Sequence, residues 1–548
     1  MSIWETDATR ILTACEDGDG QLHLLIPGRH HLLTQFQFEY LKELLSPECQ
    51  LKDLHGERFE AIKVESIIFA VTSANHSGTK RNPLPFHLRA MAIQSFSEDL
   101  PVPAFVFGID DVGQMSDFDA YTIKTIGHNS NYRFELTPEN TAVVCSTPVL
   151  EMYRQRGFRV LPAELENYQT QTFCSKLPWE YVEAIAQHQD WTEQDDIIGK
   201  VHESTVKIWT NYRLDEQVRN ILTDPIIGDD GDITQSRDYN AYVRQMDEIA
   251  ELKFRETSPF IKSGNIGDIG CAVGSWIKLA LDDGRFSESD FYGVEVARQL
   301  YDVCQQRKHN GEFGGANVFF AMKNAVTGLV FRPSSMDTIH AGSLTHEIES
   351  YGSRQDLLDF IVNRFEELRP GGVWINRDVV GPEDGDKVVY MTLNKTDGSN
   401  TDPLKETADQ VSLEKHLNGL STYSRFLRFA QDFRRSEADG IQFELTEHEE
   451  ETVISLCYRD ATEFMLTKDY TTNWLSEMHE RFCFWSFSDW KDAVEQVGFR
   501  LGSESKAYQN PWILENRWLG KVNLFQDKSL KQKQKLPPTN MLMVAQKI

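Results

Sequence analysis

Short apolar runs alternate with amphipathic stretches along the second half of the chain, from about residue 259 onward. The apolar positions in residues 355–368 recur at helical spacing, and an Arg-Pro-Gly-Gly sequence that ends helices follows from Arg369. Apolar runs predict strands at residues 266–270, 291–296, 318–320, 338–342 and 373–379. This alternation is typical of a doubly wound parallel sheet, in which ligands bind beyond the carboxyl ends of the strands.

The first 185 residues carry a second alternating pattern. It predicts strands at residues 22–26, 66–71, 105–108 and 141–145, and a helix over 38–45. Amphipathic stretches such as residues 239–255 lie between the two patterns. We therefore expect an N-terminal domain over residues 1–185, a helical linker over 186–258 and a C-terminal domain over 259–548. The predicted fold class is α/β, with two Rossmann-like doubly wound modules.

The C-terminal pattern is interrupted after residue 380. A helix over residues 488–497 and a closing strand at 541–546 supply the remaining elements of a sheet, so residues 383–487 are expected to form an inserted cap. Aromatic residues crowd the segment from residue 467 to residue 490. Such residues commonly line small-molecule pockets, but for most of them a place in the core is the stronger expectation.

Composition limits the possible partners. The chain has 548 residues, which predicts two or three domains, and a net charge of −28, which disfavours phosphate backbones and anionic membranes. Its eight cysteines form no Cys-x-x-Cys pair, and it has neither a basic–apolar leader nor an 18-residue apolar run. A cytoplasmic protein is expected. The acidic cluster at residues 228–232 is too short for a calcium loop, so no metal site is predicted.

The most informative stretch runs from Asp268 to Gly274, with the spacing acidic-x-Gly-x-small-x-Gly. It follows a predicted strand and precedes a run that can be helical, residues 275–281. Small residues at such a turn let a ligand approach the main chain closely. The dinucleotide fingerprint Gly-x-Gly-x-x-Gly needs glycine where this chain has Ser275, which disfavours a nicotinamide-dependent oxidoreductase. The stretch resembles the S-adenosylmethionine (SAM) site of class I methyltransferases.

This resemblance implies cofactor-binding roles for Asp268, Gly270, Ala272, Gly274, Glu295 and Asn324. Asp268 would support the glycine loop and the amino end of methionine. Glu295, at the tip of the second predicted strand, would accept hydrogen bonds from the ribose hydroxyls, and Asn324 would meet the adenine amino group. Ala272 and Asn324 depart from the family pattern, in which Gly and Asp are usual.

His346 and Glu347 follow the fourth predicted strand of the C-terminal pattern, on the lip where a methyl acceptor would lie. His346 is a candidate general base because histidine titrates near neutral pH, and Glu347 is a candidate to orient it. A helix N-terminus with solvated polar residues accounts for the segment equally well. Methyl transfer needs mainly positioning, so a base is not mandatory.

The N-terminal pattern carries motifs that resemble the archaeal-type nicotinamide mononucleotide adenylyltransferases. The motifs are Gly28-Arg29 with Thr34 and Gln37, then Ser73-Ala74 with Asn82-Pro83 and Arg89, then residues 146–150 with Gly157-Phe158. The resemblance implies nucleotide-binding roles for Gly28, Arg29, Thr34, Gln37 and Arg89, with ATP and magnesium as ligands.

Two departures from that family weaken the implied phosphate site. The His-x-Gly-His positions carry Thr34, Phe36 and Gln37, and the phosphate clamp at residues 170–174 has no arginine. His30 and His31 are candidates to replace the missing donors. The domain is therefore either an active nucleotidyltransferase or a degenerate, nucleotide-sensing or structural one.

Together these features predict a SAM-dependent methyltransferase fused to an adenylyltransferase-like domain, which would make the protein bifunctional if both domains are active. A small-molecule acceptor is expected, with a nucleotide- or pyridine-like compound as one option. Two alternatives stay open: a non-catalytic regulatory protein that senses nucleotide and SAM, and a transfer RNA methyltransferase. The sequence identifies neither the methylated atom nor the oligomeric state.

Overall fold

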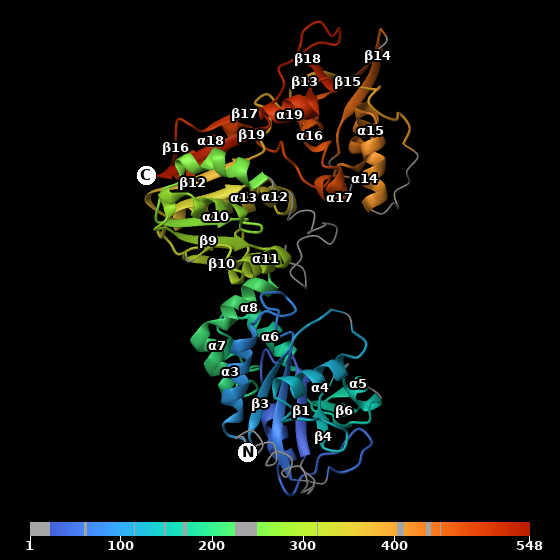
Figure 1. Cartoon of the computed structure of the whole chain (residues 1–548), viewed down its shortest axis with the longest axis vertical. Coiled ribbons are helices and arrows are strands. Elements are labelled where there is room, and N and C mark those ends of the chain that lie inside the picture. Colours follow the sequence, from blue (N-terminus) through green and yellow to red (C-terminus); the bar gives the residue numbers. More distant parts are fainter. Residues whose placement is uncertain are drawn as a thin grey trace, which may run out of the picture. The chain divides into compact units, whose positions relative to one another are not determined.

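The computed structural model divides into two compact units, Met1–Pro225 and Ile226–Ile548 (Figure 1). The described residues are 22–59, 63–113, 115–146, 149–167, 172–224, 249–314, 316–402, 410–434, 440–449 and 451–548. The acidic cluster at 228–232, most of the stretch at 239–255 and the first residues of the predicted phosphate clamp lie outside them. Among the described residues, no helix has the length and apolar character needed to cross a membrane.

The N-terminal unit is built on a five-stranded parallel sheet in the order β3-β2-β1-β4-β5. The strands are β1 (Leu22–Gly28), β2 (Val64–Thr72), β3 (Ala104–Ile109), β4 (Thr141–Val144) and β5 (Arg159–Leu161). The four strands predicted from the sequence are confirmed. The strand order reverses at β1, so a ligand crevice is expected beyond the carboxyl ends of β1 and β4.

Helices cover both faces of this sheet because successive side chains of a strand point to opposite sides. Leu24 and Ile26 pack into one core, and Leu25 packs into the other. The first core includes residues of α2 (Gln35–Leu44), α3 (Phe86–Ser97), α6 (Pro178–Gln187), α7 (Glu203–Tyr212) and α8 (Leu214–Leu222). The second includes residues of α4 (Phe118–Asn129) and α5 (Leu150–Gln155). Both α7 and α8 fall in the segment predicted as a linker.

The C-terminal unit contains an eight-stranded sheet in the order β10-β9-β8-β11-β12-β19-β16, with β17 also paired to β19. The strands are β8 (Asn265–Ile269), β9 (Asp290–Glu295), β10 (Val318–Met322), β11 (Met336–Gly342), β12 (Leu368–Asp378), β16 (Phe499–Leu501), β17 (Lys506–Tyr508) and β19 (Asn540–Lys547). The first five strands of this order run parallel, and β19 runs antiparallel to β12. The predicted doubly wound sheet is confirmed, with its switch point at β8 between β9 and β11.

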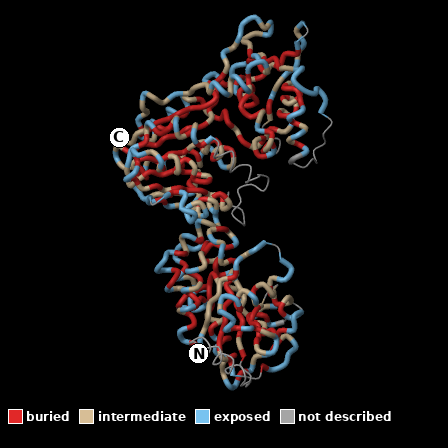
Figure 2. Tube along the Cα trace, in the orientation of Figure 1, coloured by how far each residue is buried: buried red, intermediate tan, exposed pale blue. Residues whose placement is uncertain are grey.

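Alternate residues of β19 show how the helices are held on this sheet. Met541, Met543 and Ala545 pack with α13 (Arg354–Glu367) and α18 (Phe487–Val497), whereas Leu542 and Val544 pack with α10 (Ser275–Asp282). Two further helices are α11 (Arg298–His309) and α12 (Thr345–Tyr351). Figure 2 shows that the buried residues follow the strands of both units.

A cap with its own hydrophobic core lies beside the large sheet (Figure 1). It is a four-stranded antiparallel sheet in the order β14-β15-β13-β18. The strands are β13 (Val388–Leu393), β14 (Phe443–His448), β15 (Glu451–Cys457) and β18 (Val522–Phe525). The helices are α14 (Gln410–Gly419), α15 (Thr422–Asp432), α16 (Tyr458–Thr467) and α17 (Trp474–Glu477). β18 follows α18 in the sequence, so the cap also uses residues beyond the predicted insertion at 383–487.

A fully buried ion pair between Arg364 and Glu367 anchors the end of α13. Glu367 receives two hydrogen bonds from Arg364, at 2.8 Å and 3.0 Å. One of its oxygens also accepts the N–H groups of Val330 and Phe331, at 2.6 Å and 2.9 Å. The carboxylate therefore fixes the loop between β10 and β11 near the amino end of β11.

The substitution Glu367→Ala is expected to lower the free energy of unfolding of the C-terminal unit by about 3–5 kcal/mol, because it leaves Arg364 buried without its partner. Chemical denaturation measures the loss, and hydrogen exchange in β11 and β12 identifies the unit that unfolds. The control is Glu312→Ala, which removes a partly exposed pair with Lys278 and should cost under about 1 kcal/mol. Equal losses for the two variants would contradict the expectation.

Candidate functional site

The predicted glycine loop turns the chain from β8 into α10. Gly270, Ala272 and Gly274 all have positive φ angles, of 68°, 49° and 77°. The N–H groups of Gly270 and Cys271 both donate to the Val294 carbonyl, at 2.9 Å and 3.1 Å, and so tie the loop to β9. Glycine adopts this left-handed conformation freely, whereas Ala272 is held in it at some cost.

A buried pair of Asp268 and His340 joins the start of the loop to β11. One Asp268 carboxylate oxygen lies 2.7 Å from Nδ1 of His340, and both side chains are buried. The His340 ring stacks on Trp276 of α10, with centroids 4.1 Å apart and planes within 2°. His340 and Trp276 thus fix Asp268 at the end of β8. The spacing of the loop residues did not predict either of these two partners.

Glu295 joins the loop to the end of β9. Its carboxylate accepts the N–H groups of Ala272 at 2.8 Å and of Val296 and Ala297 at 2.9 Å. Burial raises the pKa of Glu295 to about 7, although the three donors favour the ionised form. Asn324, after β10, accepts the N–H of Val326 at 2.9 Å and so shapes the next loop.

These residues meet in a cavity of about 370 Å³ at the switch point of the sheet. Five of the predicted cofactor residues line it: Asp268, Gly270, Ala272, Glu295 and Asn324. Gly274 serves packing instead, since a side chain there would come within 3.0 Å of the Phe313 ring and 3.2 Å of the Phe320 ring. The cavity continues to His346 and Glu347 and then to residues of the cap.

His346 is held by Asp378, a residue that carries no recognisable signal in the sequence. Its Nδ1 lies 2.7 Å from the Asp378 carboxylate, and its Nε2 lies 3.4 Å from Glu480. Asp378 also accepts the N–H and hydroxyl of Thr345, at 2.7 Å and 2.6 Å, at the start of α12. Asp378 therefore does the orienting that we expected of Glu347, while Glu347 lines the same cavity.

The charges around His346 favour its protonated form. Burial opposes the imidazolium, but Asp378 and Glu480 outweigh burial and raise the pKa of His346 well above its usual value. Burial likewise opposes ionisation of Asp378, but His346 and the Thr345 hydroxyl hold the pKa of this carboxyl at about 2. A histidine that already carries a proton is disfavoured as a general base.

The cap closes the far side of the cavity with aromatic and polar side chains. They are Tyr470, Glu477, Glu480, Phe482, Asn510, Trp512, Ile513 and Arg517. The Arg517 guanidinium lies over the rings of Tyr470 and Trp512, 4.7 Å and 5.5 Å from their centroids. Other aromatic residues of the same segment, such as Trp474 and Trp490, are core residues.

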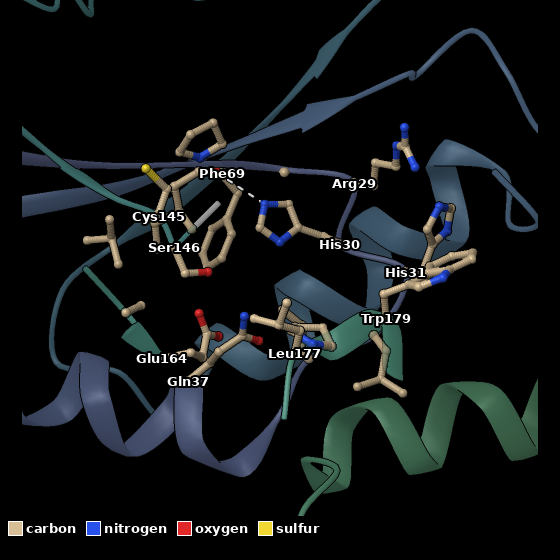
Figure 3. Close-up of a pocket in the computed structure, with 18 of the residues that line it drawn as sticks. Arg29, His30, His31, Gln37, Phe69, Cys145, Ser146, Glu164, Leu177 and Trp179 are labelled. Atoms are coloured by element: carbon tan, nitrogen blue, oxygen red, sulfur yellow. Dashed lines mark hydrogen bonds between the residues drawn. The ribbon is translucent and has the colours of Figure 1, made fainter. Parts of the chain in front are cut away.

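The N-terminal unit has its own cavity, of about 420 Å³, beyond the carboxyl ends of β1 and β4. Figure 3 shows Glu164 and Gln37 next to each other on one side and the ring of His31 beside Trp179 on the other. Most of the remaining wall is apolar, with residues such as Leu33 and Val144. This position agrees with the crevice expected from the strand order.

The residues predicted to bind nucleotide in this unit have several different roles. Gly28, Arg29 and Gln37 line the cavity. Thr34 and Gln37 form a capping box at the start of α2, in which each side chain accepts the other residue's N–H at 3.1 Å. Arg89 is buried and donates to the carbonyls of Arg29, Thr72 and Ser73 at 2.8–2.9 Å, so it ties two loops together.

Burial leaves the two histidines of this cavity uncharged, although Arg29 also lines the cavity. Burial lowers the pKa of His30 to about 4 and that of His31 well below the usual value, so both rings are neutral at neutral pH. Burial also raises the pKa of Glu164, against hydrogen bonds from Ser146 and Gln37. Neutral imidazoles beside a carboxyl group are a poor environment for a triphosphate.

No protein-family model matches the chain, and no curated protein matches it. Solved structures similar to it include a SAM-dependent methyltransferase from Mesorhizobium loti, 12% identical, over 55% of this chain and 100% of that one, with a TM-score of 0.30. A second SAM-dependent methyltransferase, from Clostridium acetobutylicum, is 10% identical over 57% of this chain and 99% of that one, with a TM-score of 0.28. A TehB-like SAM-dependent methyltransferase from Corynebacterium glutamicum is 10% identical over 57% of this chain and 98% of that one, with a TM-score of 0.27. At these values the function has to be argued from the residues of the site.

Proposed function

We propose that the C-terminal unit is a SAM-dependent methyltransferase that acts on a small molecule. The observation that carries the proposal is the meeting of Asp268, Glu295 and the left-handed loop at the switch point of a doubly wound sheet. Two carboxylates and a closely approachable backbone suit a ligand that carries an ammonium group and a ribose. The chemistry of the donor set therefore fits SAM.

The chain's own residues divide the cavity into two halves. Asp268, Glu295 and Asn324 would hold the cofactor, which supplies an electrophilic methyl group when bound. The cap would place an acceptor against it, with Tyr470, Phe482 and Trp512 excluding water and Arg517 and Asn510 offering polar contacts. Positioning of this kind accounts for most of the rate enhancement that methyl transfer requires.

A small acceptor fits better than transfer RNA. The acceptor half contains Glu347, Glu477 and Glu480, and the net charge of the chain is −28. Both features disfavour a phosphate backbone. A purely sensing role for the unit would require SAM binding without turnover. Measuring SAM binding and methyl transfer separately distinguishes this role from catalysis.

Calorimetry of the full chain with SAM should show one site, and methyl-labelled SAM with a small-molecule cell extract should yield a labelled product. Glu295→Ala should weaken SAM binding at least about 10-fold, since it removes a charge-assisted acceptor. The surface substitution Glu312→Ala should leave binding unchanged. Binding without any labelled product would indicate the sensing role, and the absence of binding would end the proposal.

The affinity for SAM should fall with pH because Glu295 becomes protonated. With a pKa of about 7, the ionised fraction of this carboxyl falls about tenfold between pH 8 and pH 6, and the dissociation constant should rise by the same factor. Calorimetry at the two pH values measures the change. Glu295→Gln should flatten the dependence, and an equally steep one in this variant would assign the titration to another group.

For the N-terminal unit, we propose that its cavity binds a small, largely uncharged ring compound and that it does not transfer nucleotidyl groups. Supporting observations are the neutral His30 and His31, the capping box of Thr34 and Gln37, and the structural use of Arg89. Such a unit would sense or retain a metabolite.

The N-terminal proposal predicts no pyrophosphate release from ATP and nicotinamide mononucleotide with magnesium, at any protein concentration that a coupled phosphate assay tolerates. ATP should bind no tighter than about 1 mM, because Arg29 is the one Lys or Arg among the described residues that line the cavity. Nicotinamide and adenine, tested separately by ligand-observed NMR, probe the ring site. Stoichiometric pyrophosphate release would show that the unit is an active nucleotidyltransferase.

A further inference from the structure

The acceptor half of the C-terminal cavity contains a cluster of a histidine and two glutamates that methyl transfer itself does not need. His346 and Glu347 lie in the first turn of α12, and Glu480 comes from the segment after α17. One ligand atom from each of the three residues lies within 4.8 Å of the others. We propose that His346, Glu347 and Glu480 bind a divalent transition-metal ion.

The spacing of the two buried members suits a metal. Nε2 of His346 lies 3.4 Å from a carboxylate oxygen of Glu480, which is long for a charge-assisted hydrogen bond. Two ligand atoms bound at about 2.05 Å to a tetrahedral ion are separated by about 3.4 Å. The pair therefore already stands at the separation that a bridging ion requires.

The opposite side of the imidazole is fixed in the way that metal-binding histidines usually are. The Asp378 carboxylate accepts from Nδ1 at 2.7 Å, which leaves Nε2 directed at Glu480. A carboxylate on the second ring nitrogen sets the tautomer and raises the basicity of the ligating nitrogen. Asp378 is itself held by the Thr345 and Val379 N–H groups, at 2.7 Å and 2.8 Å.

Glu480 is held just as firmly from the side of the cap. The Tyr351 hydroxyl donates to its second oxygen at 3.2 Å. The residues that follow it are fixed by Glu463 of α16, which accepts the N–H groups of Phe482 and Cys483 at 2.7 Å and 2.8 Å. The Arg481 N–H donates to Ser350 of α12 at 2.8 Å, so the segment with Glu480 is joined directly to the helix with His346.

Charge gives a separate reason for a cation at this place. Glu347, Glu480 and Asp378 surround a single imidazole, and the last two are buried. A protonated His346 offsets one of these charges. Lys253, which interacts with Glu347 and Asp378, and Arg377, which interacts with Asp378 but is paired with Glu256, offset a further part. Buried carboxylates are retained when a metal or another cation compensates them.

One nitrogen and two carboxylate ligands favour a first-row transition metal such as zinc over magnesium or calcium, which prefer oxygen alone. Three protein ligands also leave at least one position open toward the cavity, as in catalytic zinc sites. If the proposed methyl transfer holds, an acceptor hydroxyl bound there would lose its proton more easily. The binding of the metal does not depend on that reaction.

Zinc titration of the chelator-treated full chain, in competition with a chromophoric zinc indicator, tests the site. Wild type should bind one zinc ion that both His346→Ala and Glu480→Gln weaken at least about 10-fold. Glu347→Gln, at a less buried position, should give a smaller loss. His416→Ala is the matched control, because its ring pairs with Asp402 at 2.6 Å in the cap, and it should leave zinc binding unchanged.

Glu480→Gln retains the size of the side chain and its contact with Tyr351, so it is the variant least prone to unfold. Calorimetry with SAM, done without zinc, reports on the neighbouring cofactor half and tests the methyltransferase proposal separately. Wild type without stoichiometric zinc would overturn the metal site. Zinc bound equally well by wild type, His346→Ala and Glu480→Gln would also overturn it and would point to the cysteines instead.

Discussion

The carboxylate of Glu295 accepts three backbone N–H groups, one from the glycine loop and two from the chain just after β9. Without a side-chain acceptor there, Ala272 could not be held in its left-handed conformation beside β9 while its N–H is satisfied. The loop in turn sets where α10 begins, and α10 carries the Trp276 ring that stacks on His340. The position of Asp268 thus depends on a contact made one strand away.

Much of the C-terminal unit was predictable because its signals are local. Apolar runs gave β8 to β12 within a few residues, and the glycine spacing located the turn that lines the cavity. The partners His340, Asp378 and Glu480 were not predictable in the same way. Each lies far along the chain from the residue that it contacts, and nothing in its neighbouring sequence distinguishes it from an ordinary core or surface residue.

The N-terminal unit illustrates the opposite difficulty. The motifs around Thr34, Gln37 and Arg89 indicated where a ligand crevice would lie, and a cavity does lie there. They did not indicate how the side chains are used, because a capping box and a phosphate site both place polar residues at a helix start. Only the burial of His30 and His31 distinguishes a cavity with neutral rings from one that holds phosphates.

The placement of β18 in the cap sheet has a mechanical consequence. The chain leaves the large sheet after β12, returns at α18, leaves again after β17 and returns at β19. The cap is therefore tethered by four backbone crossings instead of the two that a simple insertion would have. A hinge motion of the cap would have to bend all four connections at once, so we expect a smaller motion than a cap with two connections would allow.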